Sequence, residues 1–115
     1  MNTTLLQNKI ESLQIIAGSL LNIDMLGSSL YIDDLARLNG EIHERIVALS
    51  FLKGNTVEQE ALLCLAILSG YSVIIYANPD DEIRKKSVLE RAGKIVEEAL
   101  PMSLKCRLLA ICGKF

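Results

Sequence analysis

The segment ALLCLAILSGYSVIIYA, residues 61–77, decides the fold: it runs for seventeen residues without a charged side chain. Its apolar residues occur all round a helix rather than along one stripe, which is typical of a helix with neighbours on every side. Directly before it, Thr56-Val57-Glu58-Gln59 has capping-box spacing, in which a hydroxyl and an amide side chain satisfy free backbone N–H groups. We therefore expect a central buried helix over residues 56–77. A membrane span is the alternative, because seventeen residues is about the lower limit for crossing a bilayer.

Amphipathic helices are predicted before this segment, over residues 4–22 and 30–52. Apolar residues recur there in steps of three and four, which places them on one face of each helix. The first set is Leu6, Ile10, Leu13, Ala17, Leu20 and Leu21, and the second is Tyr31, Leu35, Leu38, Ile42, Ile46 and Leu49.

Two more helices are predicted after it, over residues 79–100 and 103–112. Asn78-Pro79 supplies an N-cap and a proline at the first helical position, and three acidic residues follow where the helix dipole favours negative charge. Pro101 ends or kinks the first of these helices, and Gly113 ends the second. The predicted buried side of the first is Val88, Leu89, Ala92, Ile95, Val96, Ala99 and Leu100.

Length and composition agree with one all-α domain. A chain of 115 residues that is 50% apolar can bury one core, and no part of it indicates a strand with confidence. We predict a single compact bundle of about five helices, residues 1–115, around the central apolar helix. The net charge of −2 does not favour general binding to nucleic acid. Three cysteines and no cationic signal-peptide start are typical of a cytoplasmic protein with free thiols.

The sequence offers no recognisable catalytic or ligand-binding motif. His43 is the single histidine, and the cysteines, Cys64, Cys106 and Cys112, lack the paired spacing of a zinc site. Glycine-rich phosphate loops are missing, and Gly70-Tyr71-Ser72 lies in a helical run rather than in a hydrolase elbow. The acidic residues are expected on solvent faces or at helix starts. We expect no enzyme, cofactor or metal, and a binding surface as the functional feature.

Charged faces supply the candidate binding residues. Residues 54–82 hold five acidic and no basic residues, whereas residues 83–115 hold eight basic and three acidic ones. An acidic protein partner is expected to contact the polar side of the helix over 79–100 through Arg84, Arg91 and Lys94. The first candidate surface is the polar face of the helix over 30–52, with Tyr31, Arg37, Asn39, Glu41 and Arg45. The alternative in both cases is an ordinary solvated face.

The sequence resembles the UpxZ family of Bacteroides transcription antitermination antagonists. The resemblance is carried by LYIDDLARLNGEIHERIVAL (30–49), KGNTVEQEALLCLAILSGYSVIIY (53–76) and KKSVLERAGKIVEEALPMSLKCRLLAIC (85–112). It implies a regulator that binds UpxY-type NusG-like antitermination factors of other loci, alone or with RNA polymerase, and so silences non-cognate capsular polysaccharide operons. A helical oligomerisation or structural module with no role in transcription is the competing interpretation, and an enzyme comes third.

The chain departs from the family pattern after its last cysteine. Family members continue there with an acidic helical tail, whereas this sequence stops at Phe115. It is therefore either a short member or a fragment. Either case is expected to expose apolar surface that favours self-association.

Overall fold

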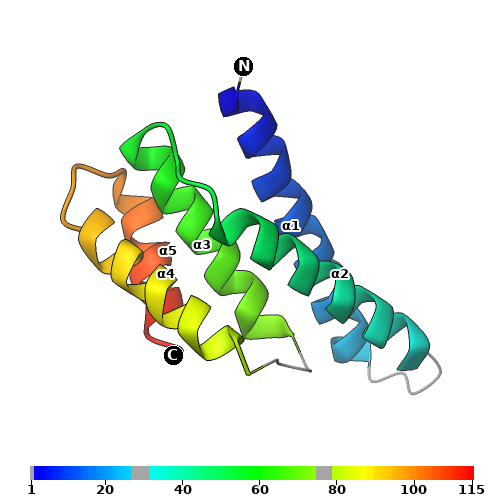
Figure 1. The fold of residues 1–115 in the computed structure, drawn as a ribbon. Helices are drawn as coiled ribbons and strands as arrows, with labels where there is room; N and C mark the ends of the chain where they lie inside the picture. Colours follow the sequence, from blue (N-terminus) through cyan, green and yellow to red (C-terminus); the bar gives the residue numbers. More distant parts are fainter. Residues whose placement is uncertain (1, 27–31, 75–78) are drawn as a thin grey trace.

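The computed structural model describes residues 2–26, 32–74 and 79–115. These residues form five α-helices and no strand (Figure 1). The helices are α1 (Asn2–Leu26), α2 (Ile32–Ser50), α3 (Val57–Val73), α4 (Asp81–Ile95) and α5 (Met102–Cys112). The prediction of an all-α fold is confirmed. Among the described residues, no helix combines the length and the apolar character that crossing a membrane requires.

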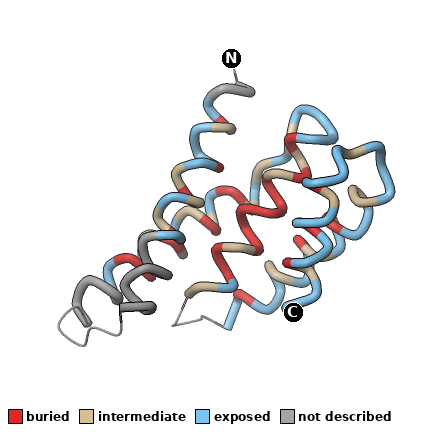
Figure 2. Tube along the Cα trace, turned by 180° about the vertical axis from the view of Figure 1, so that it is seen from behind, coloured by how far each residue is buried: buried red, intermediate tan, exposed pale blue. Residues whose placement is uncertain are grey.

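The central helix is α3, which packs against α1, α2, α4 and α5. It lies between the α1–α2 pair on one side and the α4–α5 pair on the other (Figure 1). Figure 2 shows buried residues along most of its length. They are Gln59, Ala61, Leu63, Cys64, Leu65, Ala66, Ile67, Leu68, Gly70 and Tyr71. Residues 61–71 of the uncharged run thus lie at the centre of the bundle, as their all-round apolar pattern predicts.

The predicted stripes on the first two helices also face this core. Leu6, Ile10, Leu13 and Ala17 of α1 are buried, and so are Leu38, Ile42, Ile46 and Leu49 of α2. The remaining predicted members, Leu20, Leu21, Tyr31 and Leu35, lie outside the side chains that the structure describes. At the α2–α3 crossing, a Cβ on Gly70 would lie 2.9 Å from Ile46 Cδ1. The missing side chain at Gly70 therefore lets the two helices approach closely.

Helix α3 begins as its sequence predicts. Thr56 is the N-cap, and its Oγ1 accepts a hydrogen bond from the Gln59 N–H at 3.0 Å. The Gln59 side chain accepts from the Asn55 N–H at 2.8 Å, one residue earlier than in a strict capping box. The helix ends at Val73, short of the predicted 77, because Ile74 takes an extended conformation.

Helix α4 is shorter than predicted at both ends. Its N-cap is Asp80, so Pro79 precedes the helix, and Asn78 lies outside the described residues. It ends at Ile95, after which Glu97 and Glu98 donate only to carbonyls three residues back. Two carboxylates beside the negative end of the helix dipole disfavour its continuation. Ala99, predicted to be buried, is consequently exposed.

Candidate partner-binding surface

The candidate residues of α2 do not form one exposed face. Arg37 is exposed and makes an ion pair with Glu41 at 3.6 Å. Asn39, expected on the polar face, is only 6% exposed and belongs to the buried set, so that placement was wrong. Arg45 turns toward α1 and donates to Ser12 Oγ at 3.1 Å and to the Glu41 carbonyl at 3.3 Å. Tyr31 lies outside the described residues.

The candidate residues of α4 differ from one another in their environment. Lys94 is exposed in the last turn, as expected. Arg84 makes an ion pair with Asp81 at 3.3 Å, and the Asp81 side chain is 1% exposed. The Arg91 side chain is 18% exposed and pairs with Glu60 of α3, so its expected place on a solvent-facing side was wrong. Only Lys94 among these three is therefore a fully exposed cation.

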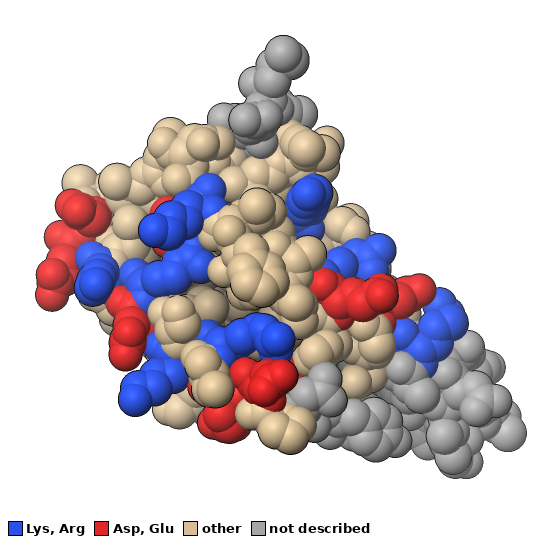
Figure 3. All heavy atoms as spheres, in the orientation of Figure 1, with Lys and Arg blue, Asp and Glu red and all other residues tan. Residues whose placement is uncertain are grey.

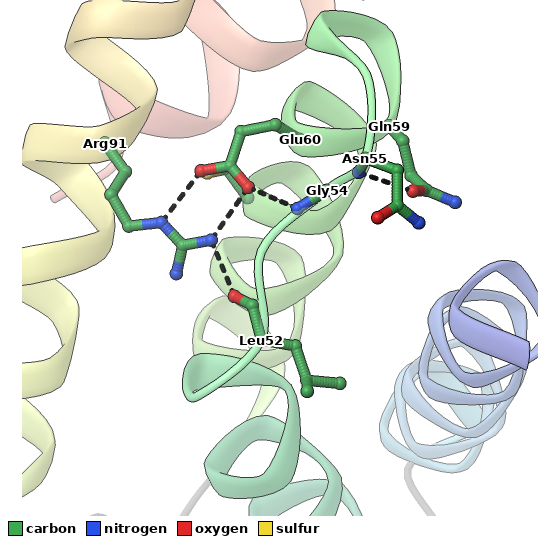
Figure 4. Close-up of polar contacts among 7 residues, drawn as sticks. Leu52, Gly54, Asn55, Gln59, Glu60 and Arg91 are labelled. Carbon is green, nitrogen blue, oxygen red and sulfur yellow. Dashed lines mark hydrogen bonds and ion pairs between the residues drawn. The ribbon is translucent and has the colours of Figure 1, made fainter. Parts of the chain in front are cut away.

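Arg91 joins α4 to the start of α3 and to the chain between α2 and α3 (Figure 4). Its Nε and Nη2 atoms each donate to one oxygen of the Glu60 carboxylate at 2.9 Å. The same Nη2 donates to the Leu52 carbonyl at 2.9 Å, and the Gly54 N–H donates to Glu60 Oε1 at 2.9 Å. A bidentate guanidinium–carboxylate pair of this kind fixes orientation as well as charge.

The pKa shifts of Glu60 and Arg91 follow from the groups around them. Burial alone would raise the pKa of Glu60, but the hydrogen bonds from Arg91 and Gly54 and the charges of Arg91 and Lys53 outweigh it. The pKa of Glu60 is therefore lowered below its ordinary value of 4.5. The pKa of Arg91 is raised, chiefly by the hydrogen bonds to Glu60. Both groups are charged at neutral pH.

A second polar cluster joins α2 to α4. His43 Nε2 and Asp81 Oδ1 lie 2.8 Å apart, and Arg84 contacts the same oxygen. Tyr71 of α3 is buried nearby, and its pKa is raised to about 12, first by burial and then by the negative charge of Asp81. The cluster joins α2 to α4 beside the buried Tyr71 of α3, which makes it a structural feature.

The thiols give no sign of an activated nucleophile. Cys64 is fully buried, and burial, followed by the nearby Glu60 charge, raises its pKa to about 12. Burial also raises the pKa of Cys112, while Cys106 is exposed. A thiol with a raised pKa is a poor nucleophile and metal ligand at neutral pH. Among the described residues, no group of three or more His, Cys, Asp or Glu is placed to hold a metal ion.

Two hollows that share Lys9 lie along α1, one against the chain that follows α2 and one against α2 itself, and we call them together the α1–α2 groove. The larger, about 250 Å³, is lined by Leu5, Leu6, Lys9, Leu52, Lys53 and Asn55. The smaller, about 170 Å³, shares Lys9 and is further lined by Ser12, Arg45, Ala48 and Leu49. Of the candidate binding residues that the structure describes, Arg45 alone lines this groove.

Sequence reasoning missed both the internal role of Arg91 and this groove. The uneven charge along the chain was the available signal for the first, since the acidic Glu60 and Asp81 pair with the basic Arg91 and Arg84 of the next segment. Predicting which acid meets which base requires the helix packing. The groove depends on how α1 and α2 meet, which a helical pattern alone does not specify.

Comparison with known proteins places the chain in a family. Residues 10–114 match the UpxZ family of transcription anti-terminator antagonists. The chain belongs to the UpxZ family. The fold of this UpxZ chain is similar to the crystal structure of a transcription anti-terminator antagonist UpxZ from Bacteroides uniformis ATCC 8492, with a TM-score of 0.79 and 34% sequence identity. The similarity covers 93% of this chain and 66% of that chain, so this UpxZ chain spans slightly less than two thirds of its relative. No curated protein matches the sequence.

Proposed function

We propose that this protein antagonises transcription anti-terminators by binding them. The observation that carries the proposal is the family match over residues 10–114. A binding role also agrees with the described part of the chain, in which the polar clusters join helices and burial raises the pKa of the Cys64 and Cys112 thiols. The function then depends on surfaces of the helices rather than on a reactive site.

The target that we propose is a UpxY-type, NusG-like factor of another locus, alone or in complex with RNA polymerase. Such a factor carries polymerase through the leader of its own operon. Binding to it would stop read-through, so that non-cognate capsular polysaccharide operons stay silent. The support is the resemblance of residues 30–49, 53–76 and 85–112 to the family, together with the helical fold that the family shares.

A transcription assay tests the proposal directly. The protein is added to RNA polymerase, a purified UpxY-type factor and a template with that factor's operon leader. We expect read-through to fall as the protein is added, and to stay unchanged when the factor is omitted. Retention of the factor on immobilised protein is the companion measurement. The proposal fails if read-through is unaffected and no NusG-like factor is retained, with or without polymerase.

The same purified protein also distinguishes the antagonist role from the oligomerisation alternative. Light scattering of the protein alone measures its mass in solution. A stable assembly combined with an empty pull-down would favour a structural module, whereas retention of the factor favours the antagonist.

A further inference from the structure

The α1–α2 groove combines an apolar floor with two exposed apolar side chains, one in its lining and one on the residue that precedes the lining residue Leu52 in the sequence. Leu6, Leu49 and Leu52 contribute the floor, and Leu5, which also lines it, is 57% exposed. Phe51, next to the lining residue Leu52, is 79% exposed. Large apolar side chains that stand in water beside a concavity are typical of protein–protein contact sites, because binding removes them from water.

The charges at the groove all have one sign. Lys9, Arg45 and Lys53 line the two hollows, and no carboxylate does. Among the described residues, neither lysine makes an ion pair. Arg45 donates to a hydroxyl and to a backbone carbonyl, which are uncharged acceptors, so these hydrogen bonds do not cancel its positive charge. The site therefore offers three cations around an apolar surface.

The face of the molecule seen in Figure 3 carries charges of both signs. Figure 3 shows basic and acidic side chains distributed around a largely uncharged area near the middle of the view. Elsewhere on α2, Arg37 is already paired with Glu41, and on α4 Lys85 is paired with Glu82. The lining of the groove, in contrast, holds three cations and no carboxylate.

We propose that the α1–α2 groove is the docking site for an acidic amphipathic segment of the anti-terminator. Such a segment presents apolar side chains to Leu5, Phe51 and the floor, and carboxylates to Lys9, Arg45 and Lys53. Charge complementarity of this kind guides association and sets orientation. The inference rests on the proposed function and adds to it the location and the chemistry of the contact.

Other occupants fit the groove less well. A nucleic acid backbone would find three cations but would also have to cover exposed Leu5 and Phe51 with phosphates. A second copy of this chain carries exposed acids such as Glu44 and Glu90 directly beside arginines, so it complements three cations less well. An acidic protein segment with apolar side chains can contact both the apolar floor and the three cations.

Two matched pairs of variants test the inference by affinity for the purified UpxY-type factor. Lys9→Glu is compared with Lys114→Glu, which makes the same charge change at an exposed lysine outside the groove lining. Phe51→Ser is compared with Ile83→Ser, because these side chains are 79% and 74% exposed. We expect Lys9→Glu and Phe51→Ser each to weaken binding about tenfold or more, and the two controls to stay within about twofold of the wild type.

The failure of this inference is distinct from that of the proposed function. If the wild type binds no NusG-like factor, the proposed function fails. If the wild type binds and both groove variants bind equally well, the antagonist role stands and the groove assignment is wrong. Thermal unfolding of each variant verifies folding, and all four substituted side chains are exposed.

Photo-crosslinking provides a second measurement that does not depend on a loss of binding. A benzophenone side chain at position 51 is activated in the presence of the factor, and the attached peptide is identified by mass spectrometry. We expect a crosslink to an acidic segment of the factor. A crosslink formed only with another copy of this chain, only with RNA, or with a basic segment of the factor overturns the inference.

Discussion

Glu60 is the residue at which the α2–α3 connection and α4 meet. One carboxylate accepts from the Arg91 guanidinium and from the Gly54 N–H, and Arg91 in turn donates to the Leu52 carbonyl (Figure 4). Each of these groups gives its partner a hydrogen bond in place of the one to water that is lost on folding. Removing Arg91 therefore leaves the Leu52 carbonyl without this donor, and it leaves the partly buried Glu60 carboxylate with the Gly54 N–H but without the guanidinium.

Replacing Arg91 with Gln is expected to lower the free energy of unfolding by about 2–3 kcal/mol at pH 7, because Glu60 then keeps its charge without its cation. Lys86→Gln on the same helix is the control, and its exposed side chain predicts a change within about 0.5 kcal/mol. Urea unfolding followed by circular dichroism measures both. Equal stability of the two variants would contradict the role given to Arg91.

The lowered pKa of Glu60 predicts how this contribution depends on pH. The unfolded chain takes up the proton at a higher pH than the folded one, so the stabilisation is complete above about pH 5 and is lost as the pH falls through the folded value. Glu60→Gln cannot titrate there. The stability difference between the wild type and Glu60→Gln should therefore shrink between pH 7 and pH 3 in urea unfolding. A difference that is constant over this range would show that the pKa is not lowered.

Two glycines in different surroundings give a matched prediction. A Cβ on Gly54 would overlap the Glu60 backbone nitrogen and lie 2.7 Å from the Gln59 carbonyl carbon, whereas a Cβ on Gly93 would meet nothing within 4 Å. Gly54→Ala should cost about 2 kcal/mol or more, since backbone must move. Gly93→Ala, at an exposed position within α4, should raise the free energy of unfolding by about 0.5–1 kcal/mol. Thermal unfolding of both variants checks the opposite signs.

At the scale of helices, the sequence predicts which segments are helical better than it predicts where they stop. All five helices were predicted, and the apolar stripes of α1 and α2 face the core as expected. Periodicity carries that information over many residues. The ends of α3 and α4 were placed too late, because the extended Ile74 and the acids Glu97 and Glu98 act locally against a continuing apolar pattern.

The candidate site was less accessible to sequence reasoning than the fold. A helical wheel places Asn39 and Arg91 on polar sides, yet one is buried and the other is bound to Glu60. A long side chain can reach a partner on a neighbouring helix that the wheel does not contain. The groove residues Leu5 and Lys53, which flank helix ends, had no pattern that would single them out.

The N-terminus of α3 offers a test at this scale. Thr56→Ala removes the oxygen that accepts from the Gln59 N–H, and about 1 kcal/mol of stability should be lost. Thr56→Ser keeps the acceptor and should recover most of it. Urea unfolding compares the three proteins, and equal loss in the serine variant would mean that the methyl group matters rather than the cap.

At the scale of the whole molecule, α3 is shared by both helix pairs. A side chain at its centre is therefore reached by solvent only when the bundle opens. Cys64 is such a side chain, being fully buried, while Cys106 on α5 is exposed. The reactivity of Cys106 therefore measures access to the surface, and that of Cys64 measures access to the core.

Alkylation with iodoacetamide at pH 8, followed by mass spectrometry, should modify Cys106 first and Cys64 last. Burial and the pKa of about 12 both protect Cys64. Its modification rate should rise with urea in parallel with global unfolding, whereas that of Cys106 should change little. Modification of Cys64 in the native protein at a rate similar to that of Cys106 would show that α3 is not enclosed.

Because the inner sides of four helices all pack on α3, the outer sides of those helices are under little constraint from folding. Sequences built on this plan can diverge in those outer positions while the interior drifts slowly. A set of paralogues could then acquire distinct targets through a handful of surface replacements, and comparing such paralogues position by position would separate the residues that preserve architecture from those that choose the target.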